Sequence, residues 1–142
     1  MKKPKSYSIQ SFIDNRGRIE FSNEFNFSPY KRFYLISPDH EGQVRAWQGH
    51  KFEEKAFLII SGKIKIVLIP ALDLDRRIFG TAKEFILDES EPGIIYIPGG
   101  YLNGFQFLSP DSKLMVFSNF TLEESKGDDY RFDPLQFYDW TK

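Results

Sequence analysis

The chain has 142 residues, no cysteine and a net charge of −1 at pH 7. This length suits a single domain with one hydrophobic core, which we expect to span residues 1–142. A charge near zero provides no basic field for a phosphate backbone, so we expect no nucleic-acid partner. The lack of cysteine excludes disulfides, thiol catalysis and zinc–thiolate sites.

The N-terminal segment favours a cytoplasmic protein. Its first residues, MKKPK, are followed by SYSIQ, whereas a signal peptide would continue with an apolar stretch. No apolar run in the chain approaches the length that spans a bilayer. We therefore expect a cytoplasmic location and no membrane partner.

Apolar residues recur at every second position, which is typical of β-strands. In chain order the predicted strands are 18–21, 32–36, 43–47, 55–60, 63–69, 84–87, 94–97, 104–108 and 113–119. Within 63–69, Ile64, Ile66 and Leu68 alternate with other residues and predict a half-buried strand. Ser61-Gly62 predicts a two-residue hairpin that joins this strand to the preceding one.

The C-terminal part contains one helix signal and an aromatic tail. Thr121 and Glu124 have the spacing of a capping box, which predicts a short helical turn. Residues 130–140 are too aromatic for a disordered tail and are expected to pack back on the strands. Many short strands separated by turns predict an all-β sandwich or barrel.

Two stretches carry most of the candidate chemistry. In residues 45–55, Gln48 and His50 share one face of an extended chain. Lys55 is in phase with Phe57 and Ile59, so it either reaches water at the strand end or faces a polar cavity. In residues 98–105, the glycines permit a tight turn where backbone approaches a ligand.

These stretches resemble the two motifs of the cupin superfamily, which implies a double-stranded β-helix, or jelly-roll. The motif positions are occupied by Gln48, His50, Glu54 and Gly62, and then by Pro98, Gly100 and Asn103. One histidine and one carboxylate, with amides elsewhere, make a poor transition-metal site. We therefore expect neither a metal nor another cofactor, and we interpret His40 as a solvated loop residue.

Within the cupins, the chain resembles the dTDP-4-dehydrorhamnose 3,5-epimerases and the related dTDP-sugar 3,4-ketoisomerases (WxcM-like). The matching stretches, in order, are FIDNRGRIE at 12–20, KRFYLI at 31–36 with RAWQGH at 45–50, residues 97–109, and residues 131–140. They span almost the whole chain. The resemblance implies proton abstraction next to a ketone, which requires a base, a cation at the enolate oxygen and an acid.

The resemblance also assigns roles to residues. His50 corresponds to the second ketoisomerase histidine, or to the epimerase base if the loop is two residues longer, and is the expected base. Lys55 corresponds to the lysine at the substrate oxygen, and Asp133 to the aspartate that orients the base through a hydrogen bond. Phe117 occupies the position expected for the acidic tyrosine, which argues against epimerisation on two faces. The candidate substrate-binding residues are Arg45, Gln48, Arg16, Asn103, Phe117 and Tyr101.

The resemblance implies a nucleotide-sugar epimerase or ketoisomerase that acts on a 4-keto-6-deoxyhexose linked to dTDP. Two alternatives remain open at this point: a non-catalytic binder of sugar nucleotides, and a different small-molecule cupin activity. Related epimerases exchange an N-terminal strand between subunits. Residues 14–21 match that strand, so we expect a homodimer in which Arg16 of one subunit approaches the pocket of the other.

Overall fold

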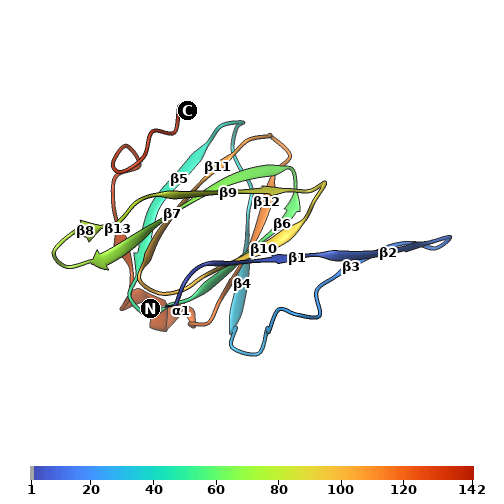
Figure 1. The fold of residues 1–142 in the computed structure, drawn as a ribbon, viewed down its shortest axis with the longest axis horizontal. Helices are drawn as coiled ribbons and strands as arrows, with labels where there is room; N and C mark the ends of the chain where they lie inside the picture. Colours follow the sequence, from blue (N-terminus) through green and yellow to red (C-terminus); the bar gives the residue numbers. More distant parts are fainter. Residues whose placement is uncertain (1) are drawn as a thin grey trace.

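The computed structural model describes residues 2–142 and contains two facing antiparallel sheets (Figure 1). The first sheet has the order β1 (Lys5–Ser8), β10 (Gly93–Ile97), β6 (Lys55–Ser61), β12 (Lys113–Ser118) and β4 (Arg32–Ile36). The second has the order β13 (Tyr130–Arg131), β5 (Val44–His50), β11 (Tyr101–Phe107), β7 (Lys63–Asp73) and β8 (Ile78–Phe79), and β9 (Lys83–Asp88) also pairs with β7. This arrangement confirms the predicted all-β jelly-roll, or double-stranded β-helix.

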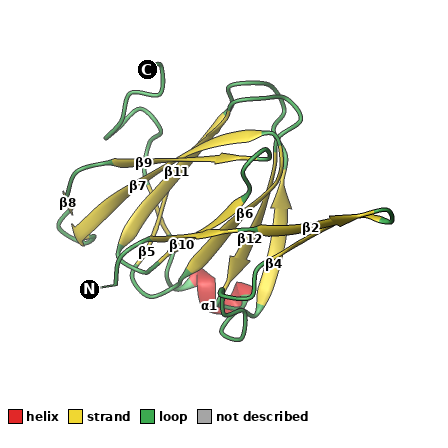
Figure 2. Cartoon of the chain, turned by 45° about the vertical axis from the view of Figure 1, so that its right-hand side comes forward, coloured by secondary structure: helices red, strands yellow, loops and turns green. Residues whose placement is uncertain are grey.

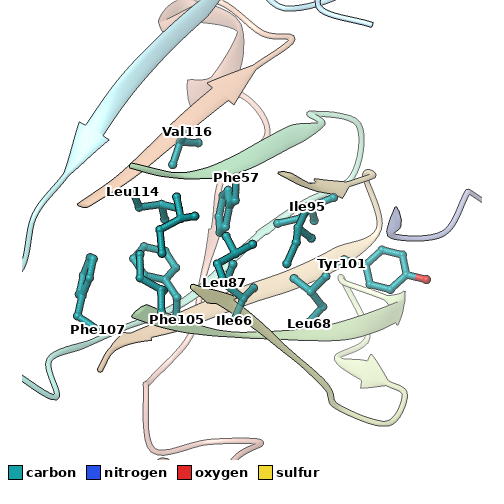
Figure 3. Packing of buried hydrophobic residues seen from close by; sticks show 13 residues of the cluster. Phe57, Ile66, Leu68, Leu87, Ile95, Tyr101, Phe105, Phe107, Leu114 and Val116 are labelled. Atoms are coloured by element: carbon teal, nitrogen blue, oxygen red, sulfur yellow. The ribbon is translucent and has the colours of Figure 1, made fainter. Parts of the chain in front are cut away.

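The main core lies between the two sheets (Figure 3). Its inward side chains include Ile66 and Leu68 from β7, Phe105 from β11, Phe57 from β6 and Leu114 from β12. The alternation of apolar residues places these side chains on the shared inner faces. Their burial supplies the driving force for closing the sheets on each other.

Strand β7 is buried on both faces, whereas the sequence predicted a half-buried strand. Its outward Val67 is fully buried and belongs to a second apolar cluster with Trp47 and Trp140. The rings of Trp47 and Trp140 lie 5.3 Å apart. The C-terminal tail therefore packs back on the barrel, as predicted, and covers the face of β7 that was expected to be exposed to solvent.

The predicted hairpin at Ser61-Gly62 is wrong. Strand β6 pairs with β10 and β12, whereas β7 pairs with β11, β8 and β9, so the chain passes from one sheet to the other at this turn. Gly62 has a φ of +80°, and a Cβ atom there would lie 2.5 Å from the Cα of Ser112. The glycine thus makes a corner between sheets and not a tight turn within one sheet.

The N-terminal region forms a separate hairpin of β2 (Gln10–Asp14) and β3 (Gly17–Phe21), which extends away from the barrel (Figures 1 and 2). Phe12, Ile13 and Ile19 are each more than half exposed on it. Such a hairpin buries little of its own apolar surface.

The helix α1 (Leu122–Lys126) lies at one end of the barrel (Figure 2). Its predicted capping box is confirmed: the Glu124 N–H donates to Thr121 Oγ1 at 3.2 Å, and the Thr121 N–H donates to Glu124 Oε1 at 2.9 Å. Between residues 2 and 142, no helix is both long and apolar enough to cross a membrane.

Candidate active site

A cavity of about 560 Å³ opens between the two sheets beside α1. Its apolar wall contains Ile36, Phe57, Phe105 and Val116. Its polar wall contains Arg32, Arg45, Gln48, Lys55, Asn103 and Arg131. This volume and this mixture of surfaces suit a small organic ligand that carries negative charge.

An irregularity in β5 brings Arg45 into the cavity. Asn103 of β11 pairs with Gln48, whereas Phe105 pairs with Arg45, so β5 has one more residue than β11 between the two pairs. Paired residues project from the same face of a sheet, and a bulge changes the alternation on the longer strand. Arg45 and Gln48 therefore both line the cavity, although strict alternation would place them on opposite faces.

Lys55 begins β6 and is 3% exposed. Its Nζ donates a hydrogen bond of 2.7 Å to Gln48 Oε1 and lies 6.0 Å from the centre of the Tyr34 ring. Burial lowers the pKa of Lys55 to about 8, although the Glu53 carboxylate opposes this effect. Of the two interpretations left open by the sequence, the structure places the lysine in the polar cavity.

His50 ends β5 and is buried next to the cavity, but it is not part of the cavity lining. Its Nδ1 lies 2.5 Å from the main-chain oxygen of Asp128 and donates to it, because a carbonyl can only accept. In the neutral ring Nε2 therefore carries the lone pair, and it has no hydrogen-bond partner within residues 2–142. Burial lowers the pKa of His50, and the charge of Lys55 lowers it further. A neutral imidazole with a free Nε2 has the form required of a general base.

The expected contact between Asp133 and His50 is replaced by one with Asp128. Asp133 is exposed and accepts a hydrogen bond from the Leu135 N–H. Asp128 is 5% exposed and lies two residues after the end of α1. Its carboxylate accepts three N–H bonds from residues 51–53, at 2.6, 2.8 and 2.8 Å. Asp128 thus fixes the loop after β5 as well as the imidazole.

The side chains at the expected cupin metal positions bind other protein groups. Gln48 accepts from Lys55 and donates to Asp129 Oδ1 at 3.2 Å. Asn103 Nδ2 donates to the Gln48 main-chain oxygen at 3.3 Å. Within residues 2–142, no three side chains of His, Cys, Asp or Glu gather in a way that could hold a metal ion. The expected absence of a metal remains a prediction, and elemental analysis of protein prepared without added metal tests it.

Three other candidate residues lie outside the cavity lining. Phe117 is on the outer face of the first sheet, where its ring lies 5.4 Å from that of Phe27, because Val116 and Ser118 take the inward positions of β12. Tyr101 is buried in the main core. Arg16 is exposed near the tip of the β2–β3 hairpin and pairs with Asp14 at 2.7 Å. Substrate-binding roles for Phe117 and Tyr101 therefore lack support within one chain.

The structure adds four residues that the sequence did not single out. Tyr34 and Arg32 project into the cavity from β4, and Arg131 does so from β13. The alternation of residue types in RFYLI, residues 32–36, indicated that Arg32 and Tyr34 share one face of the strand. Glu53 is a buried carboxylate beside His50, and nothing in the loop sequence KFEE distinguishes it from a solvated glutamate.

A family profile described as FdtA, WxcM-like, C-terminal matches residues 2–142. The chain belongs to this family. Curated proteins gave no match to this WxcM-like chain. Solved structures show the same fold at low identity.

The 3,4-ketoisomerase QdtA of Thermoanaerobacterium thermosaccharolyticum, a double mutant bound to TDP, is 18% identical to the WxcM-like chain, with a TM-score of 0.71 over 93% of this chain and 89% of that one. A 3,4-ketoisomerase from Helicobacter canadensis is 21% identical, with a TM-score of 0.70 over 93% and 92%. The rmlC epimerase of Mycobacterium tuberculosis is 17% identical, with a TM-score of 0.77 over 96% and 74%.

Proposed function

We propose that this protein is a sugar-nucleotide isomerase that acts on a 4-keto-6-deoxyhexose linked to dTDP. The observation that carries the proposal is Lys55, a nearly buried ammonium in the wall of a cavity, with the neutral His50 close by. A cation at a substrate oxygen and a base at the adjacent carbon are what ketone-directed proton transfer requires. Family membership and the likeness to two 3,4-ketoisomerases support the same chemistry.

In the proposed reaction, His50 Nε2 removes the proton from the carbon next to the ketone. The electrons of that C–H bond form the enolate, whose oxygen is stabilised by the Lys55 ammonium. Return of the proton to the former carbonyl carbon, with transfer of the hydroxyl proton between the two oxygens, moves the ketone by one carbon without net oxidation. Because His50 is buried and is not part of the cavity lining, this step requires side chains of the cavity wall to move when the sugar binds.

The charge of the cavity supports a nucleotide diphosphate as the bound group. Arg32, Arg45, Lys126 and Arg131 line it in addition to Lys55, whereas Asp129 is the one acidic residue in its described lining. Arginine binds phosphate oxygens in bidentate fashion, and Lys126 supplies a further charge. We propose that these side chains bind the diphosphate, while the apolar wall accepts the sugar.

Ketoisomerisation is the favoured form of the reaction. Epimerisation on two faces needs an acid opposite the base, and Phe117, at the position expected for it, has no acidic proton and lies outside the cavity. A single base that moves one proton between neighbouring carbons does not need that acid. The phenol group in the lining of the cavity is that of Tyr34, and burial raises its pKa.

The direct test is incubation of the protein with dTDP-4-keto-6-deoxyglucose in D₂O, followed by NMR. We expect a 3-keto product, which carries deuterium at the former carbonyl carbon where the proton on Nε2 exchanges with solvent before it is returned. The variant His50→Asn should abolish exchange and change nucleotide affinity less than about threefold, while His40→Asn, at an exposed histidine, should behave as wild type. Wild-type protein that binds the sugar nucleotide but yields neither the 3-keto product nor deuterium exchange would establish the non-catalytic binder instead.

We further propose that the protein is a homodimer held by the β2–β3 hairpin. The exposed Phe12, Ile13 and Ile19 support this proposal, since a second copy would cover them and bring Arg16 near its cavity. A monomeric mass in light scattering at micromolar concentration would contradict it.

The single-domain organisation of residues 1–142 and the cytoplasmic location remain predictions, which limited proteolysis and cell fractionation test.

A further inference from the structure

Glu53 lies in the loop between β5 and β6, and its side chain is completely buried. Ser118 Oγ from β12 donates to its Oε2 at 2.7 Å, and Ser125 Oγ from α1 donates to its Oε1 at 2.5 Å. Arg32 Nη2 from β4 lies 3.4 Å from Oε2, and His50 Nδ1 lies 3.5 Å from Oε1. Taking a carboxylate out of water is costly, and the four partners of Glu53 offset that cost.

The surroundings of His50 show why a negative charge is useful there. Lys55 of β6 faces it with a positive charge, and Tyr101 of β11 is its cross-strand neighbour. The Asp128 carboxylate is held by three main-chain N–H groups. Among residues 2–142, Glu53 is the one carboxylate within ion-pair distance of the imidazole. A proton taken up by His50 would otherwise add a second buried cation beside Lys55.

We propose that Glu53 is a positioning residue, whose buried carboxylate supplies the counter-charge for His50 and Lys55 and whose contact with Ser125 holds α1 at the cavity. Burial lowers the pKa of both groups, and the Glu53 charge opposes that effect in both. The kinetic part of this inference rests on the proposed function, whereas the coupling of Glu53 to His50 exists in the resting protein and is measured there.

The test is an NMR titration of the histidine rings in wild type and Glu53→Gln, with Glu54→Gln as the matched control. Glu54 is adjacent but pairs with Lys2, and its side chain is 20% exposed. Because the amide has no charge, the pKa of His50 should fall by about one further unit in Glu53→Gln. The ring of the exposed His40, which lies beside Asp39, provides an internal reference signal in all three proteins. An unchanged pKa of His50 in folded Glu53→Gln would overturn the proposal.

If Glu53→Gln fails to fold, judged by circular dichroism, Glu53→Asp takes its place. The shorter side chain keeps the charge but moves it away from Nδ1, so the pKa of His50 should fall by a smaller amount, and no fall would again overturn the proposal. With the sugar nucleotide, kcat of Glu53→Gln should drop about tenfold with KM nearly unchanged, and the acidic limb of kcat/KM should move to lower pH. A change in KM alone would contradict a role in proton transfer. If wild type is inactive, the proposed function fails while the titration still decides the role of Glu53.

Discussion

Lys55 Nζ donates a hydrogen bond of 2.7 Å to Gln48 Oε1, so this buried ammonium is paired with a neutral amide. The amide nitrogen of Gln48 is in turn 3.2 Å from Asp129 Oδ1, which fixes the orientation of its oxygen toward the lysine. An amide oxygen solvates an ammonium without offsetting its charge. This explains how the lysine can be held in the wall with a pKa near 8 and still be available to a substrate oxygen.

Replacement of Lys55 by Met should stabilise the fold near neutral pH. The pKa of this lysine falls from 10.5 in the unfolded chain to about 8 in the fold, so the unfolded state binds more protons between these values. The cost of the buried charge is therefore fully present below pH 8 and disappears as the pH rises towards 10.5. Urea unfolding should show Lys55→Met more stable by roughly 2 kcal/mol at pH 7, with a much smaller difference at pH 10. An equal difference at both pH values would mean that the lysine is not held as a charged group.

The same lysine sets the expected pH dependence of the reaction. Enolate stabilisation needs the charged ammonium, so kcat/KM should decline as the pH rises through about 8. The decline should be about tenfold for each pH unit above the pKa if one group is responsible. A profile measured by product NMR from pH 6 to 10 checks this, and a rate that stays constant up to pH 10 would remove Lys55 from the mechanism.

Asp128 and Asp133 should differ sharply when each is changed to Asn. Asp128→Asn replaces a buried carboxylate that accepts three N–H bonds, and it should lower the free energy of unfolding by about 2–3 kcal/mol. Asp133 is exposed, so Asp133→Asn should leave stability within about 0.5 kcal/mol and leave deuterium exchange near wild type. Loss of exchange in a stable Asp133→Asn protein would restore the role that the family resemblance gives to this residue.

Gly62 and Gly42 allow the corner between β6 and β7 to be tested with a matched control. Both have positive φ, +80° and +86°, but a Cβ atom at Gly62 would meet Ser112 at 2.4–2.5 Å. Apart from the two chain neighbours of Gly42, nothing among residues 2–142 lies within 4 Å of a Cβ atom at that position. Gly42→Ala should cost about 1 kcal/mol from backbone strain alone. Gly62→Ala should cost at least about 2 kcal/mol more, because Ser112 is buried and its side chain is held by hydrogen bonds to the main chain. Equal losses in thermal unfolding would contradict this account of the corner.

Local patterns predicted the strands better than they predicted the pairing. The strand at 32–36 and the capping box at Thr121 depend on neighbouring residues only, and both agree with the structure. The Ser61-Gly62 signal is equally local, since a positive φ suits a hairpin and a corner between sheets alike. The choice between the two depends on which strands lie next to β6 and β7, and the sequence of the turn does not contain that information.

The candidate site was predictable where motifs fixed the spacing and not where distant segments meet. Lys55 and Arg45 were identified from the first motif, and both line the cavity. Arg45 reaches it through the bulge in β5, which alternation alone does not predict. The roles of Asp128 and Glu53 depend on contacts that bring α1 and the loop after β5 together. For this reason Asp133 was predicted in place of Asp128, and Glu53 was not predicted.

The contact between His50 and the Asp128 carbonyl joins residues 78 positions apart. During synthesis the first half of the chain leaves the ribosome without the group that selects its imidazole tautomer. Strand β13 and Arg131, which complete the second sheet and the cavity wall, emerge later still. Chains interrupted before Asp128 would therefore hold a histidine with no fixed tautomer and a cavity without its last wall, so binding competence arises late, after the last strand has paired.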